Sequence, residues 1–79
     1  MANLRIRISF FGEKIKEPII YQIGQEYKLV TNIRRADVTE KTGWVDLELS
    51  GETDEIERCI AGLKEKGVTV DPIERNIIE

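Results

Sequence analysis

The sequence predicts an α+β sandwich, in which one four-stranded antiparallel sheet carries two helices on the same face. Three observations lead to this prediction. Segments 4–10 and 45–49 alternate apolar and polar residues with the period of two that is typical of a strand with one buried face. Segments 17–27 and 53–66 place apolar residues at helical spacing. With a further extended segment after each helix, the order along the chain is βαββαβ.

The first strand and the first helix are joined by the loop FFGEKIKEP. Pro18 suits the first turn of a helix, where its missing N–H needs no partner, and Ile19 and Ile23 share one face of the turns that follow. Gly24 lowers helix stability by about 1 kcal/mol relative to alanine. We therefore expect a close approach of this helix to the sheet to require the glycine.

The second half of the chain carries clear boundary signals. The turn EKTG precedes the third strand, and its glycine, Gly43, can adopt a positive φ. Thr53 is expected to cap the helix that follows, and Gly67 is expected to end it. The last strand begins at about Val68, and Pro72, which has no N–H, limits how far that strand continues.

These elements predict the ferredoxin-like fold. Right-handed crossovers close two split βαβ units into a sheet with strand order 4-1-3-2. Residues 1–79 are expected to form a single domain, since this length leaves no room for two cores. Both helices cover one face, so the other face is open to water or to a partner. Strand parity places compensating charges on that open face: Arg5, Arg7, Asp46, Glu48 and Asp71.

Composition excludes several classes of function. The chain has 12 basic and 15 acidic residues and a net charge of −3, whereas nucleic acid and anionic membranes attract a positive field. No apolar run is long enough for membrane insertion, and the sequence is typical of a cytoplasmic protein. It contains no histidine, no residue set that indicates an enzyme, and no cluster that indicates a metal or cofactor. The single cysteine, Cys59, lies in an apolar helical stripe and is expected in the core, without a disulfide.

The segment TNIRRADV follows neither the helical nor the strand period throughout. If Ile33 faces the core, strict alternation also buries the charged residues after it, whereas Ala36 and Val38 have the character of core residues. A β-bulge at Arg34 and Arg35 would switch the parity, and bulges are common on edge strands. The sequence therefore predicts a bulged edge strand here.

An edge strand has free N–H and C=O groups that can pair with a copy of the same edge. Asn32 can offer both a donor and an acceptor to a ligand held at that seam. The alternative is an edge that the bulge merely protects from pairing. Trp44, the only tryptophan, is expected on the open face, either as a cover for the sheet or as an anchor for a ligand or partner.

The ordered set of segments resembles the NIL domain family, which is named for an Asn-Ile-Leu tripeptide in its second strand. RISFFGEKIKEPIIYQI resembles the first strand and proline-led helix, TNIRRADV the name-giving strand, GWVDLELSG the third strand, and EIERCIAGLKEKGVTVDPIE the last helix and strand. Asn32 and Ile33 match the tripeptide, and Arg34 stands where the family has leucine. NIL domains are ferredoxin-like, and they occur at the C-terminus of methionine-importer ABC ATPases and beside iron–sulfur ferredoxin modules.

The resemblance implies a regulatory module and not an enzyme. In the transporters the domain pairs with a second copy and senses substrate, binding methionine near the paired second strands. For this chain it implies a homodimer that binds a small amino-acid-like ligand, with methionine as one candidate. The ligand-binding residues lie along the second strand: Asn32, Ile33, Arg34 and Arg35. The interface residues lie on that strand or on the open face: Thr31, Ala36 and Trp44.

The alternative function is a protein-interaction adaptor. In this hypothesis the open sheet face docks a ferredoxin-type redox partner or a transporter partner, and Trp44 anchors the contact.

Overall fold

The structure, a computed structural model, describes residues 2–13 and 17–77, with side chains as far as residue 73. Its helices and strands follow in the expected order: β1 (Ala2–Phe11), α1 (Ile19–Glu26), β2 (Leu29–Val38), β3 (Thr42–Gly51), α2 (Thr53–Glu65) and β4 (Thr69–Ile77). Among the described residues, no helix combines the length and the apolar character needed to cross a membrane.

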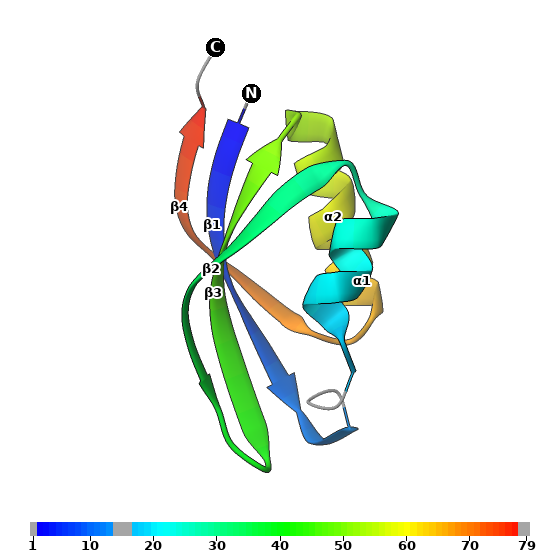
Figure 1. The fold of residues 1–79 in the computed structure, drawn as a ribbon, viewed down its shortest axis with the longest axis vertical. Coiled ribbons are helices and arrows are strands. Elements are labelled where there is room, and N and C mark those ends of the chain that lie inside the picture. Colours follow the sequence, from blue (N-terminus) through cyan, green and yellow to red (C-terminus); the bar gives the residue numbers. More distant parts are fainter. Residues whose placement is uncertain (1, 14–16, 78–79) are drawn as a thin grey trace.

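The four strands form one antiparallel sheet in the order β2-β3-β1-β4, which confirms the predicted topology and the ferredoxin-like fold. Figure 1 shows α1 and α2 on the same side of a strongly twisted sheet, whose other face carries no helix. The central pair, β1 and β3, runs in unbroken register from Ala2 opposite Gly51 to Phe11 opposite Thr42. β2 and β4 are therefore the edge strands.

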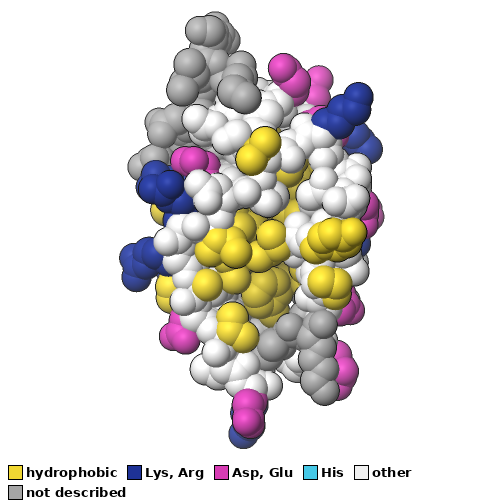
Figure 2. All heavy atoms as spheres, viewed as in Figure 1, with side chains coloured by type: hydrophobic (Ala, Val, Ile, Leu, Met, Phe, Trp, Pro, Cys, Tyr) yellow, Lys and Arg dark blue, Asp and Glu magenta, His cyan; other side chains and the backbone are white. Residues whose placement is uncertain are grey.

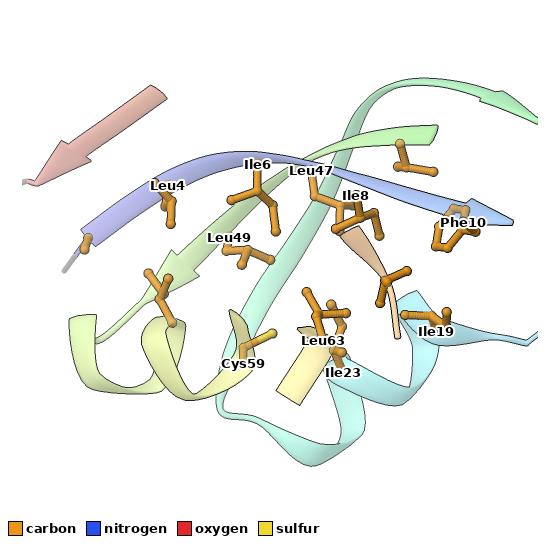
Figure 3. Packing of buried hydrophobic residues seen from close by; sticks show 14 residues of the cluster. Leu4, Ile6, Ile8, Phe10, Ile19, Ile23, Leu47, Leu49, Cys59 and Leu63 are labelled. Carbon is orange, nitrogen blue, oxygen red and sulfur yellow. The ribbon is translucent and has the colours of Figure 1, made fainter. Parts of the chain in front are cut away.

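The core is one apolar layer between the central strands and the helices (Figure 3). β1 buries every second residue, because successive side chains of a strand point to opposite faces. Cys59 lies in the core as predicted, and burial raises the pKa of its thiol to about 11. The buried hydrophobic side chains are Ala2, Leu4, Ile6, Ile8, Phe10, Ile19, Ile23, Val45, Leu47, Leu49, Ile56, Cys59, Leu63 and Val68.

The carboxylate of Glu55 ties α2 to the start of β2. It accepts a hydrogen bond of 2.7 Å from the backbone N–H of Lys28 and forms an ion pair with Arg58. Both interactions hold the pKa of the Glu55 carboxyl below its ordinary value, and the backbone hydrogen bond contributes most. The guanidinium of Arg58 lies over the ring of Tyr27, 5.5 Å from its centroid.

The turn between β2 and β3 differs from the prediction. Gly43 lies within β3 and does not adopt a positive φ. The turn is closed instead by Thr39, whose backbone N–H and hydroxyl both donate to the carbonyl of Thr42, at 2.7 and 2.9 Å. Gly67 follows the end of α2, as predicted, and it has a positive φ of 87°.

Two other boundary predictions were wrong. Thr53 is the first residue of α2, and Glu52 takes the N-cap position without a side-chain cap hydrogen bond. β4 continues past Pro72 to Ile77, because Pro72 lies on an edge strand and a register shift next to it realigns the pairing with β1.

The glycines inside the two helices have different surroundings. A Cβ added at Gly24 would meet nothing within 4 Å, so the expected close approach to the sheet does not exist. A Cβ added at Gly62 would lie 2.0 Å from the hydroxyl oxygen of Tyr27. Gly62, which the sequence reasoning missed, is the helical glycine that packing requires.

We predict opposite effects of alanine at these two positions. Gly24→Ala should raise the free energy of unfolding by up to about 1 kcal/mol, because alanine favours the helix and nothing obstructs it. Gly62→Ala should lower it by roughly 1 kcal/mol or more, because Tyr27 must leave its packed position. Urea unfolding followed by circular dichroism measures both, and the loss at Gly62 should shrink in a Tyr27→Phe background. Equal gains from the two substitutions would contradict the contact with Tyr27.

Candidate functional site

β2 is held in the sheet by its backbone, without a buried side chain. It pairs with β3 along its length, yet none of its 10 residues is buried. In the part of the chain that the structure describes, no strand pairs with the outer side of β2. The outward N–H and C=O groups of this edge are therefore available to another strand or to a ligand.

A bulge at Arg34 changes the parity of β2, as the sequence predicted. Ile33 lies opposite Leu47, and the next paired residue, Arg35, lies opposite Asp46, so Arg34 is the extra residue. Directly opposite residues of an antiparallel pair share a face of the sheet. Ile33 is therefore on the helix side, as Leu47 is, and Arg35 is on the open face.

The bulge places Asn32, Arg34 and Arg35 together on the open face. Asn32 lies opposite Glu48, an open-face residue of β3. Arg34 follows Ile33, so the alternation of the strand directs it to the face opposite to that of Ile33. Arg35 shares this face because the bulge has reset the alternation. All three side chains are exposed.

Trp44 joins these residues at the same end of the open face. It lies opposite Asp37 of β2 and is half-buried. The guanidinium of Arg7 lies 4.2 Å from the centroid of its ring, and that of Arg35 lies 5.7 Å away. The structure thus brings Trp44 next to one of the predicted ligand-binding residues, with an arginine of β1 against the same ring.

A row of alternating charges crosses the open face. Asp46 of β3 lies between Arg35 of β2 and Arg7 of β1. On its other side, Arg7 lies opposite Asp71 of β4. Arg7 donates two hydrogen bonds to Asp46, at 2.7 and 3.0 Å. These bonds raise the pKa of Arg7 and hold the pKa of Asp46 below its ordinary value. The predicted charge compensation is confirmed.

The helix side of β2 carries the other predicted residues. Thr31 lies opposite Leu49, Ile33 opposite Leu47, and Ala36 opposite Val45. Ala36 and Val38 were expected in the core, but both are exposed, with Val38 at 56% and Ile33 at 54%. The reason is that the helices lie over the central strands and leave this end of the edge strand uncovered.

An apolar pocket of about 210 Å³ lies between the start of α1 and the sheet, and Val38 of β2 is one of its lining residues. In the space-filling view, hydrophobic side chains gather in the middle of the face that shows α1 and the β2 edge (Figure 2). The sequence reasoning missed the pocket, because its lining residues share neither a segment nor a period. They are Phe10, Glu17, Pro18, Ile19, Ile20, Tyr21, Val38 and Val45.

The predicted site residues thus lie on two faces. Asn32, Arg34, Arg35 and Trp44 share the open face, whereas Thr31, Ile33 and Ala36 are on the helix side. Among the described residues, no three acidic or cysteine side chains gather closely enough to hold a metal ion.

The Arg7 and Asp46 pair predicts a loss of stability in acid. Because the pKa of Asp46 is lowered in the fold, its charged form stabilises the protein above the ordinary pKa of about 3.9, and this contribution is lost as the pH falls through the lowered value. The free energy of unfolding should fall between about pH 5 and pH 2. Asp46→Asn should flatten this dependence, with the remaining slope due to Glu55.

Urea unfolding at a series of pH values measures the slope. Glu40→Gln, which removes an exposed carboxyl in the turn between β2 and β3, serves as the control and should leave the slope unchanged. A slope that is the same in Asp46→Asn as in the wild type would show that Asp46 does not carry the effect.

Comparison with known proteins places the chain in a family. The NIL domain family model matches residues 4–72. The C-terminal domain of an ABC transporter ATP-binding protein from Enterococcus faecalis is 31% identical, with a TM-score of 0.77 over 89% of this chain and 82% of that chain. The de novo designed protein Foldit4 is 17% identical, with a TM-score of 0.64 over 99% and 98% of the two chains, a likeness of fold alone. Among curated proteins, none matches this sequence. Because the family model spans most of its length, the chain belongs to the NIL domain family.

Proposed function

We propose that this chain is a non-catalytic, cytoplasmic regulatory module that pairs with a second copy through the β2 edge. In this proposal the dimer binds a small amino-acid-like ligand, with methionine as one candidate, beside Asn32. The observation that carries the proposal is the free β2 edge, which has no buried residue and presents Asn32, Arg34 and Arg35 on one face and Ile33 and Val38 on the other. Membership of the NIL domain family and the similarity to a domain of an ABC transporter ATP-binding protein support a regulatory role beside a transporter.

The apolar side of the edge supports pairing with a second copy. Ile33 and Val38 are more than half exposed, and a second sheet that continues past β2 would cover them. Full burial of one such side chain contributes roughly 1.5–3 kcal/mol. The other edge is less suited to pairing, because Pro72 of β4 lacks an N–H.

The polar side of the edge supports binding of a ligand with both donors and acceptors. Asn32 is exposed and has no hydrogen bond to a described residue, so its amide N–H and carbonyl groups are free for a ligand. A ligand that binds one arrangement of the dimer more tightly than another would shift the equilibrium between them. This is the physical basis of a sensing role.

The adaptor hypothesis has less support. Most charges on the open face have partners within that face, and the Trp44 ring lies near two arginines of its own chain. A partner protein would have to displace these contacts in order to reach Trp44.

Pairing through β2 is tested with aspartate substitutions on the two edges. Ile33→Asp should raise the dissociation constant of the dimer by roughly 100-fold or more, because a two-fold interface carries each substitution twice. Ile73→Asp, on β4 and of similar exposure at 51%, should leave the dimer intact. Analytical ultracentrifugation measures both variants and the wild type. A wild-type protein that remains monomeric at high concentration rejects the pairing.

Ligand binding is tested by calorimetry with methionine and a panel of other amino acids. We expect heat of binding for the wild type and a loss of affinity of roughly tenfold or more for Asn32→Ala, which removes the amide. Gln25→Ala, an exposed amide on α1, is the matched control and should bind as the wild type does. The absence of heat with every amino acid rejects the sensing role and leaves the adaptor hypothesis. In that case, capture of a partner protein in a pull-down should be lost in Trp44→Ala and kept in Asn32→Ala.

A further inference from the structure

Two arginines at the bulge form no ion pair with a described carboxylate. Of the arginines whose side chains the structure describes, Arg5, Arg7 and Arg58 form ion pairs. Arg34 and Arg35 form none with a described residue. Arg35 lies over the face of the Trp44 ring, and its charge also helps to lower the pKa of Asp46. Both arginines are exposed. Their guanidinium groups are therefore free to bind an anion.

The bulge is what brings these two arginines to one face. In a regular strand, consecutive residues point to opposite faces, so one arginine would lie beside α1 and the other on the open face. The extra residue in β2, between the pairs Ile33 with Leu47 and Arg35 with Asp46, removes that separation. Two adjacent guanidinium groups then lie at the rim of the open face, next to Asn32.

The nearby carboxylates do not neutralise this rim. Asp46, opposite Arg35, already accepts two hydrogen bonds from Arg7. Asp37 lies opposite Trp44 on the same face and forms no ion pair with a described residue. On the open face of β2 itself, Arg34 and Arg35 stand against Asp37 alone, which gives two positive charges to one negative charge. The rim is locally positive on a chain whose net charge is −3.

We propose that Arg34 and Arg35 form a carboxylate-binding pair, and that the ligand of the β2 edge is an anionic dicarboxylic amino acid and not a neutral one. This inference rests on the proposed ligand-binding function and names the class of ligand. A zwitterion such as methionine brings one carboxylate and one ammonium, so it leaves the excess charge of the rim unchanged. A second carboxylate gives each guanidinium its own partner in the planar geometry that an arginine matches best.

The fluorescence of Trp44 reports on this site, because Trp44 is the only tryptophan and Arg35 lies over its ring. The dimer is titrated with glutamate, methionine and inorganic phosphate. We expect glutamate to bind at least about tenfold more tightly than methionine, with an affinity that falls as salt is added. Arg34→Gln and Arg35→Gln should each weaken glutamate binding by about tenfold. Arg34→Lys should recover only part of the lost affinity for glutamate, because lysine keeps the charge but cannot form the bidentate hydrogen bonds of a guanidinium.

Lys64→Gln is the matched control, since it removes one positive charge from an exposed position on α2, in the layer on the other side of the sheet. It should bind glutamate as the wild type does. Circular dichroism of each variant verifies that it is folded.

The outcomes separate this inference from the proposed function. Methionine binding that is lost in Asn32→Ala and unaffected by either arginine substitution overturns the inference and leaves the proposed function standing. Phosphate binding as tight as that of glutamate, lost in the same arginine variants, supports an oxyanion site but overturns its assignment to an amino acid. No fluorescence or calorimetric response to any of the three compounds overturns both.

Discussion

Burial of a single apolar layer is the constraint on which the rest of the structure depends. A chain of 79 residues can build only one core, and here β1, β3 and the two helices supply most of it. β2 contributes no buried side chain and is attached mainly through backbone pairing with β3. Apart from Leu29, which is partly buried and packs against the core, its side chains are exposed or only partly covered, and the edge strand can carry residues that suit binding.

The bulge at Arg34 turns this edge strand into a surface with two kinds of chemistry. Without it, Arg35 and Asp37 would lie on the helix side with Ile33, where apolar neighbours would make their charges costly. With it, the charged residues lie on the open face, and Ile33, Ala36 and Val38 lie on the helix side, where Val38 also lines the pocket. One inserted residue thus decides the face of every residue that follows it in β2, since a shift of one position reverses the alternation.

The open face can remain in contact with water because most charges of its central strands pair with charges on the neighbouring strand. The row from Arg35 through Asp46 and Arg7 to Asp71 alternates in sign, so correct register gives attraction, and a slip of one residue would lose it. Asp46 is largely shielded from water, at 8% exposure, but its two hydrogen bonds from Arg7 satisfy its charge. The guanidinium of Arg7 that donates these bonds also lies 4.2 Å from the centroid of the Trp44 ring.

The sequence by itself determined the order of the elements, the inward residues of β1 and β3, the charge pairing of the open face and the bulge in β2. Each of these follows from local alternation or from pairing between neighbouring strands, which a linear pattern records. Only the tertiary structure decided that Ala36 and Val38 are exposed, that Gly62 and not Gly24 is required by packing, and that a pocket lies beside α1. These features depend on how far the helices extend over the sheet and on contacts between residues distant in sequence, such as Gly62 with Tyr27, for which the linear pattern carries no signal.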